Sequence, residues 1–209
     1  DEVYNLAAVH TTPGHADHEY YDTNVSGAIN IVKFCEQHIV KTLFFASSIS
    51  VYGPSENPVN ESSPCEPISA YGKSKLLAES IHELWARSGE IRKLIVARLA
   101  VIFGPGENGN FTRLGKALST GFFFFPGRRD TVKGCAHVDE VLRAFRFAED
   151  RPERIYTFNV AYPYPYTLEQ ICEAFQKIGN LPRPRGTVPT SAMLLATLPL
   201  EFMSWIGLK

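Results

Sequence analysis

Apolar runs that alternate with segments of helical periodicity are the feature that most restricts the fold of this chain. Three runs read as buried strands, namely residues 3–9 (VYNLAAV), 41–48 (KTLFFASS) and 91–103 (IRKLIVARLAVIF). Between them, residues 17–37 and 70–89 place apolar side chains at the spacing of one helix face. Strands and helices in this order form parallel βαβ units. The pattern predicts an α/β fold with a Rossmann-type, doubly wound parallel sheet.

The second half of the chain follows a looser pattern. Helices are predicted near 111–120, at 137–150 and at 167–179, the last with Thr167 as its N-cap, and a strand at 155–160. We assign residues 1–110 to the latter part of the Rossmann-type domain and 111–209 mainly to a smaller, C-terminal substrate-binding region. Elements at about 137–160 are expected to return to the sheet. The FFFF run (122–125) suits either core or an apolar pocket. Residues 192–208 are predicted to be a buried or interface helix broken at Pro199 and Glu201, with a membrane-surface role as the alternative.

The composition excludes several classes of function. The chain has 209 residues, 44% of them hydrophobic and 21% charged, and its net charge is −1. It therefore lacks the basic field that drives binding to nucleic acid. The four cysteines and the histidines show no metal-like spacing, so free thiols and no metal site are expected. We expect a cytoplasmic protein that has no membrane partner.

Candidate catalytic residues lie where two of these elements meet. Ligands of open parallel sheets bind beyond the carboxyl ends of the strands, and Ser47 and Ser48 end the run 41–48. Tyr71 and Lys75 are four residues apart and share one helix face. A lysine ammonium beside a phenol favours the phenolate, and a serine hydroxyl can bind the same phenol. This set predicts proton transfer at an alcohol or carbonyl, which requires a nicotinamide cofactor as hydride acceptor. A solvated tyrosine and lysine are the alternative.

At this point the sequence resembles the extended short-chain dehydrogenase/reductases, the NAD-dependent epimerase/dehydratase group. The matching segments run in order over nearly the whole chain. They are NLAA (5–8), NVSGA (24–28), SSISVYG (47–53), PISAYGKSK (67–75), RLAVIFGPG (98–106), AHVDEV (136–141) and TFNV (157–160). Several independent motifs in one order make the resemblance specific.

The resemblance implies a role for each matching position. Tyr71 would be the general acid/base, Lys75 would hold the cofactor ribose and lower the pKa of Tyr71, and Ser48 would be their serine partner. The implied cofactor-binding residues are Leu6, Ala7, Ala8, Asn24, Ser47, Tyr71, Lys75, Gly104 and Pro105. The implied substrate-binding residues are Lys133, Asn110 and Arg185. It further implies NAD or NADP as cofactor, a nucleotide sugar as substrate, and a homodimer.

Residues 104–109 read GPGENG and match the Gly-x-Gly-x-x-Gly turn that binds a dinucleotide. In the family that this chain resembles, however, the glycine turn lies well before the NLAA strand. Pro105 also lacks the backbone N–H that a phosphate cradle uses. We therefore predict a false fingerprint whose loop roofs the active site. With no true glycine turn present, we expect an N-terminally truncated chain that lacks roughly 60–80 residues and is inactive alone.

Three functions remain open on the sequence. The first is an NAD(P)-dependent epimerase, dehydratase or reductase that acts on a nucleotide sugar. Nucleotide-sugar relatives often carry asparagine where this chain has Val101, which leaves room for a hydroxysteroid-dehydrogenase-like enzyme acting on an apolar alcohol. The third is a non-catalytic, nucleotide-sensing member, which the missing glycine turn favours.

Overall fold

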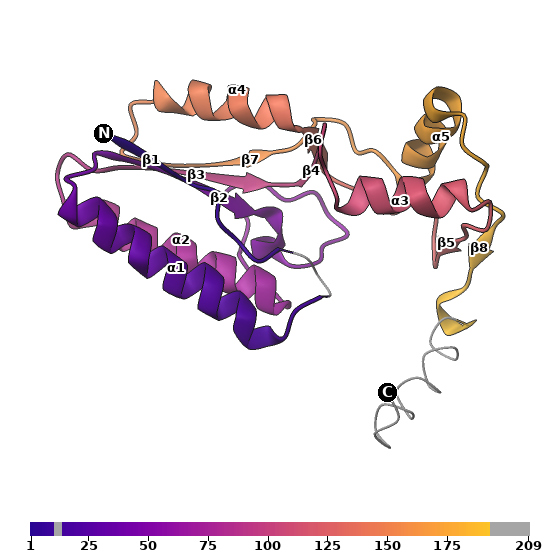
Figure 1. Ribbon diagram of the computed structural model, residues 1–209, viewed down its shortest axis with the longest axis horizontal. Coiled ribbons are helices and arrows are strands. Elements are labelled where there is room, and N and C mark those ends of the chain that lie inside the picture. Colours follow the sequence, from indigo (N-terminus) through magenta and orange to yellow (C-terminus); the bar gives the residue numbers. More distant parts are fainter. Residues whose placement is uncertain (11–13, 193–209) are drawn as a thin grey trace, which may run out of the picture. The chain divides into compact units, whose positions relative to one another are not determined.

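The computed structural model describes residues 1–10 and 14–192. Its main sheet has four parallel strands in the order β1-β2-β3-β7 (Figure 1). These strands are β1 (Glu2–Asn5), β2 (Thr42–Ser48), β3 (Lys93–Leu99) and β7 (Ile155–Val160). Helices α1 (Asp17–Gln37), α2 (Ala70–Arg87) and α4 (Val138–Glu149) connect them. The predicted α/β fold is confirmed.

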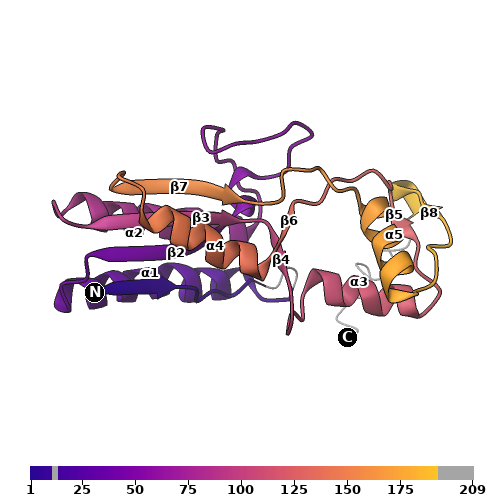
Figure 2. The ribbon, with the colours of Figure 1, turned by 90° about the horizontal axis from the view of Figure 1, so that it is seen from above.

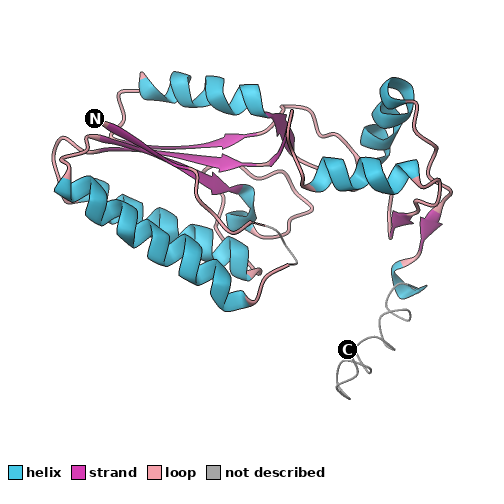
Figure 3. Cartoon of the chain, in the orientation of Figure 1, coloured by secondary structure: helices cyan, strands magenta, loops and turns pink. Residues whose placement is uncertain are grey.

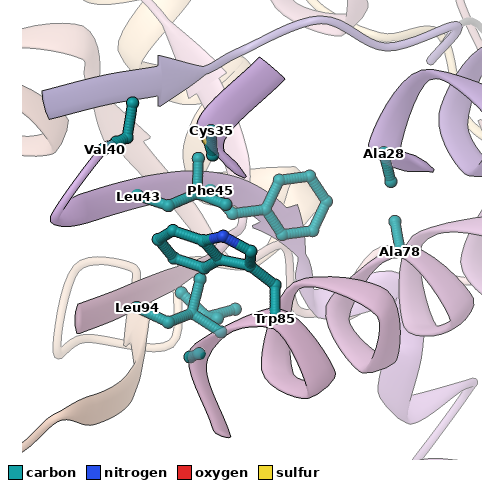
Figure 4. Close-up of a cluster of buried hydrophobic side chains, with 10 residues drawn as sticks. Ala28, Cys35, Val40, Leu43, Phe45, Ala78, Trp85 and Leu94 are labelled. Carbon is teal, nitrogen blue, oxygen red and sulfur yellow. The ribbon is translucent and has the colours of Figure 1, made fainter. Parts of the chain in front are cut away.

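One face of the sheet is covered by α1 and α2, which lie side by side (Figures 1 and 3). Alternate residues of β2, Leu43 and Phe45, point toward these helices, as the period of two along a strand requires. Figure 4 shows Phe45 beside the indole of Trp85 from α2, with Ala28 of α1 facing Ala78 of α2. The two alanines let the helices approach closely. The buried cluster on this face is the largest in the described residues.

The opposite face is covered by α4, which lies over the strands in Figure 2. Phe44, between Leu43 and Phe45, points to this side and packs edge-on against Phe145 of α4 with ring centroids 5.6 Å apart. Ile95 and Ala97 of β3 belong to the same cluster. Helices on both faces of a parallel sheet make the fold doubly wound.

Two predicted strands differ from the observed ones. The run 3–9 was expected to be a strand buried on both faces, but β1 ends at Asn5 and lies at an edge of the described sheet, with Tyr4 48% exposed. The run 91–103 is two strands, since β3 stays in the main sheet and β4 (Val101–Phe103) pairs with β6 (Cys135–His137) in a separate one. A continuous apolar run does not indicate the residue at which the chain leaves one sheet and pairs with a strand of another.

The chain divides into two compact units. The first contains residues 1–104 and 135–161, so the segment expected to return to the sheet belongs to it, through β6, α4 and β7. Its first boundary lies at Gly104, whereas the sequence-based assignment put it at residue 110. The second unit contains 105–134 and the residues from 162 onward.

The second unit has a small core of its own. It is built from α3 (Asn110–Ser119), β5 (Phe125–Pro126), α5 (Leu168–Gly179) and β8 (Thr187–Val188). Leu118, Phe125 and Cys172 are its most buried side chains. The predicted N-cap of α5 is correct, because Thr167 accepts from Gln170 N at 3.2 Å and the Gln170 side chain accepts from Thr167 N at 2.9 Å.

The apolar stretch 192–208, predicted to be a helix, lies almost entirely outside the described residues. Within the described ranges, no helix combines the length and apolarity needed to cross a bilayer. All four cysteines are free thiols, as expected.

Candidate active site

The site is assembled where β2 ends and α2 begins. Ser48 is the last residue of β2 and caps the short 3₁₀ helix η1 (Ile49–Tyr52) by accepting from Ser50 N at 3.2 Å. The N-cap of α2 is Ser69, which accepts from Gly72 N at 3.0 Å. Gly72 then lies against η1 so closely that a Cβ atom would be 2.4 Å from the Ser50 carbonyl oxygen. Only glycine permits this approach, which brings the first turn of α2 beside Ser48.

The close approach joins two predicted catalytic residues. The Ser48 hydroxyl lies close enough to the Tyr71 phenol to act on its pKa. Burial raises the pKa of the Tyr71 phenol above its ordinary value, and the Ser48 hydroxyl opposes that rise without cancelling it. Tyr20 of α1 packs against Tyr71 with ring centroids 6.1 Å apart and helps to bury it. Without a ligand, burial therefore favours the protonated form of the phenol.

Lys75 lies one helical turn beyond Tyr71 and is only 1% exposed. Its ammonium lies over the ring of Phe45, 4.2 Å from the centroid. Burial lowers the pKa of Lys75 to about 8, and the nearby Glu79 carboxylate opposes that shift. Without a ligand, burial dominates the pKa of the Tyr71 phenol and the Lys75 ammonium faces Phe45, so the lowering of the Tyr71 pKa by Lys75 stays a prediction.

The residues present fit the ribose end of a nicotinamide dinucleotide. Among the described residues, Lys75 makes a ring contact but no hydrogen bond, so its three N–H donors are unspent. A buried ammonium with free donors is costly unless acceptors reach it. Ligand hydroxyl groups would meet that need, and Leu6, Ala7 and Ala8 follow β1 at the same carboxyl edge of the sheet, with Leu6 and Ala7 exposed.

Asn24 connects the loop after β1 with the catalytic helix. Its side chain accepts from Val9 N at 3.0 Å and donates to Val9 O at 3.2 Å and to Ser74 Oγ at 2.9 Å. Ser74, the neighbour of Lys75, donates in turn to Tyr71 O at 2.8 Å. The amide of Asn24 therefore fixes the end of the predicted cofactor-binding segment relative to Tyr71 and Lys75. Its predicted contact with the cofactor itself stays a prediction.

A buried polar network lies behind the site. The Ser47 hydroxyl donates to Glu79 Oε1, so this side chain is turned toward α2. Glu79 also accepts from Arg98 of β3, at 3.1 Å from Nε and 2.8 Å from the terminal nitrogen. Arg98 donates to Tyr52 Oη at 2.9 Å, which donates to Asn159 Oδ1 of β7 at 2.8 Å. Polar groups from three neighbouring strands and α2 are thus linked beneath the carboxyl edge of the sheet.

Sequence reasoning missed Glu79 and Arg98, although both leave a signal. Glu79 follows Lys75 by four residues and extends the helix face that Tyr71 and Lys75 share. Arg98 interrupts an otherwise apolar strand, and a buried guanidinium requires an acidic partner. Neither signal names the partner, because the pairing depends on how α2 packs on β3.

A second missed pair is Asn5 and His82. Asn5 Nδ2 donates to His82 Nε2 at 3.1 Å, which places the proton of the neutral ring on Nδ1. His82 is fully buried, and its Nδ1 has no hydrogen-bond partner within the described residues. Burial, assisted by the charge of Lys75, lowers the pKa of His82 to about 4. The imidazole is therefore neutral at physiological pH.

In the GPGENG turn, the Glu107 side chain folds back and binds the first turn of the helix that follows. Glu107 Oε2 accepts from Thr112 N at 2.9 Å and from Thr112 Oγ1 at 2.6 Å, at the start of α3. Burial raises the pKa of Glu107, but hydrogen bonds from Thr112, Gly109 and Phe111 outweigh it and lower the pKa. A carboxylate thus takes the place where a helix N-terminus would bind phosphate. The observation supports the prediction of a false fingerprint.

Gly104 has a structural reason of its own. Its φ is +152°, and a Cβ atom there would be 2.8 Å from Val138 Cγ1 and 3.3 Å from His137 Nε2. The glycine lets the end of β4 approach the start of α4. Pro105 is exposed. The predicted contact of both residues with a cofactor stays a prediction.

The three predicted substrate residues all belong to the second unit. Lys133 is exposed, and its backbone N–H donates to Tyr166 O at 2.8 Å. Asn110 begins α3 and accepts from Arg113 at 3.0 Å. Arg185 donates to Gly121 O at 2.6 Å and lies over the Phe122 ring. This last side chain is engaged in joining two segments of the unit, and substrate contact by all three remains a prediction.

An open groove of about 400 Å³ also lies in the second unit. Its lining includes Arg129, Lys177 and Arg183 together with Glu169 and Glu173. The three predicted substrate residues do not line it. In the described residues, no cluster of three or more histidine, cysteine or acidic side chains is arranged to hold a metal ion.

Comparison with known proteins places most of the chain in one family. The profile described as "NAD dependent epimerase/dehydratase family" matches residues 1–161. N-acetyl-α-D-glucosaminyl-diphospho-ditrans,octacis-undecaprenol 4-epimerase of Escherichia coli O157:H7 is 34% identical over 148 residues, which cover 70% of this chain and 45% of that protein. This chain therefore spans less than half the length of that curated relative.

Solved structures resemble most of this chain. MoeE5 in complex with UDP-glucose and NAD gives a TM-score of 0.77 at 26% identity, with 89% of this chain and 64% of that one covered. UDP-N-acetylglucosamine 4-epimerase of Methanobrevibacter ruminantium M1 gives a TM-score of 0.80 at 21% identity, with 90% and 64% covered. The latter likeness is one of fold.

Proposed function

Because the chain belongs to the NAD dependent epimerase/dehydratase family, we propose that it is an NAD-dependent 4-epimerase acting on a diphosphate-linked sugar. The observation that carries the proposal is the placement of Ser48 beside the half-buried Tyr71, with the buried Lys75 one helical turn away. NAD is favoured over NADP by the family description and by the NAD bound in MoeE5.

Tyr71 is the proposed general acid and base. In its ionised form, the phenolate accepts the proton of the sugar hydroxyl as that carbon becomes a carbonyl, and the resulting phenol returns the proton when the alcohol forms again. The bound cofactor supplies the hydride acceptor and donor. Ser48 orients the phenol and stabilises its ionised form, while Lys75 holds ligand hydroxyl groups with its unspent donors.

The substrate class is proposed from the relatives. The curated Escherichia coli relative is named for a sugar linked through diphosphate to undecaprenol, and MoeE5 was solved with UDP-glucose. Both compounds are sugars linked to a diphosphate, and we propose this shared class as the substrate of the present chain. The hydroxysteroid and non-catalytic alternatives remain outcomes of the test below.

To test the proposal, the protein is expressed from its complete native gene and its turnover of candidate substrates is measured. Candidate substrates are UDP-glucose, UDP-N-acetylglucosamine, the polyprenyl diphosphate sugar and a hydroxysteroid, and C4 epimers or reduced NAD are measured. We expect Tyr71→Phe to lower turnover by about 100-fold or more with unchanged circular dichroism. Lys75→Met should act similarly, whereas the exposed Lys73→Met on the same helix should not. Activity of Tyr71→Phe within threefold of the wild type would contradict the proposal.

We also propose a homodimer through α1 and α2. Their outer faces leave Ile29, Phe34, Leu77 and Leu84 between 42% and 69% exposed. Leu77 and Leu84 are seven residues apart on α2 and lie on one stripe. Two paired helices with an apolar outer stripe suit packing against a second copy. Light scattering should give a dimer that Leu84→Arg dissociates, and a monomeric wild type at micromolar concentration would refute the proposal.

A further inference from the structure

The second unit carries a surface whose chemistry the proposed reaction does not use. We call it the β5–β8 surface and define it as residues 121–129 and 183–188. The two segments run side by side (Figure 1), joined by hydrogen bonds from Phe125 N to Gly186 O at 2.8 Å and from Gly127 N to Val188 O at 2.9 Å. A third bond, from Arg185 N to Phe123 O at 2.9 Å, extends the pairing toward Phe122. The surface is therefore a fixed structural feature.

Alternation along the FFFF run divides its four rings between core and solvent. Phe125 is buried and Phe123 packs against the same core, whereas Phe122 is 66% and Phe124 is 42% exposed. The Arg185 guanidinium lies 3.9 Å from the centroid of the Phe122 ring and keeps that ring in place. The predicted uses of the run, as core or as an apolar pocket, do not explain why the Phe122 and Phe124 rings are exposed to solvent.

The same surface is basic. It contains Arg128, Arg129, Arg183 and Arg185 and no acidic residue. Arg128 pairs with Asp130 at 2.6 Å and Arg129 with Glu169 at 3.4 Å, but within the described residues Arg183 and Arg185 form no ion pair. Residues 105–134 and 162–192 hold eight basic and four acidic side chains, whereas the first unit holds twelve and seventeen. The net charges of +4 and −5 concentrate positive charge on the unit that bears the exposed rings.

The chain continues from this surface into apolar sequence. Five residues after β8, residues 193–208 read MLLATLPLEFMSWIGL, which contain one charged residue, Glu201, and a tryptophan, Trp205. Aromatic and aliphatic residues beside arginines are the composition of segments that lie in a membrane interface. Nucleic acid would match the arginines but would leave this apolar sequence without a partner.

We propose that the β5–β8 surface docks the protein on an anionic phospholipid membrane. Phe122 and Phe124 enter the interface between headgroups and acyl chains, and the arginines attract the lipid phosphates. The inference does not require the proposed reaction, although a membrane surface is where a polyprenyl-linked sugar would be met. This proposal differs from the sequence-based expectation of a cytoplasmic protein that has no membrane partner.

Flotation with lipid vesicles tests the proposal without any measurement of turnover. The vesicles are phosphatidylcholine alone or phosphatidylcholine with about 30% phosphatidylglycerol, in about 0.1 M salt. We expect the wild type to float with the anionic vesicles at least about tenfold more than with the neutral ones. The double variant Phe122→Ser/Phe124→Ser and the single variant Arg183→Glu should each lower the bound fraction about fivefold or more.

Phe147→Ser is the matched control. Phe147 of α4 is 63% exposed and has the Arg151 guanidinium 5.7 Å from its ring, but it belongs to the acidic first unit. It should float like the wild type, and thermal melts should show that all variants fold. Wild-type flotation by the phenylalanine double variant or by Arg183→Glu would overturn the proposal, as would equal loss in Phe147→Ser. Stronger retention by single-stranded RNA than by anionic vesicles would also overturn it. Each of these results leaves the proposed reaction untouched.

Discussion

Glu79 and Arg98 form a two-point ion pair between the catalytic helix and the centre of the sheet. Nε of Arg98 lies 3.1 Å from Oε1 and its terminal nitrogen 2.8 Å from Oε2 of Glu79, and both side chains are about 10% exposed. Burial lowers the pKa of Arg98, but its hydrogen bonds to Glu79 and Tyr52 outweigh this and raise the pKa. The pair fixes α2, and with it Tyr71 and Lys75, on strand β3.

Removing one member of this pair should cost far more than removing both. We expect Arg98→Met or Glu79→Leu to lower the free energy of unfolding by about 3–5 kcal/mol, because each leaves a buried charge alone. The double variant should lose much less than the sum of the two. Urea unfolding of the four proteins measures the coupling. Strict additivity would mean that the two residues do not act as a buried pair.

Ser48→Ala should raise the pKa of the Tyr71 phenol further. The Ser48 hydroxyl opposes the effect of burial, and without it burial acts alone. Ultraviolet difference titration against Tyr71→Phe should show the phenol ionising at higher pH. We expect turnover to fall about 10- to 100-fold, the usual cost of a lost hydrogen bond to a charged group. Ser48→Thr, which keeps the hydroxyl, should restore both readings, and an unchanged titration would refute the contact.

The protein should lose stability as the pH falls through the range in which His82 titrates. The pKa of the buried ring is about 4, below the unfolded value of 6.5, so the unfolded state binds a proton first. Stability is complete above pH 6.5 and declines toward pH 4, by roughly 3 kcal/mol for this group. Urea midpoints measured across the range should show a smaller decline in His82→Gln. The exposed His38→Gln is the control and should keep the wild-type slope.

Glu107→Gln separates the two interpretations of the GPGENG turn. If the carboxylate only caps α3, the variant should lose about 1 kcal/mol of stability and bind NAD with unchanged affinity. Lys75→Met, by contrast, should weaken NAD binding. Calorimetric titration with NAD of the protein expressed from its native gene measures both affinities. A tenfold change in NAD affinity for Glu107→Gln would return the turn to the cofactor site.

The sequence by itself determined what depends on local spacing. Periodicity located α1, α2, β2 and β7, and the four-residue spacing placed Tyr71 and Lys75 on one helix face. The N-cap at Thr167 was also readable, because a capping box involves only residues three apart. These features follow from backbone geometry that neighbouring residues share.

Only the tertiary structure decided which distant groups meet. The bond between Tyr52 and Asn159 spans 107 positions, and its existence depends on strand order and register. The split of 91–103 into two strands and the raised pKa of Tyr71 were decided in the same way. A sequence pattern shows which side chains are apolar or charged, whereas burial and the choice of partner arise when separate elements pack together.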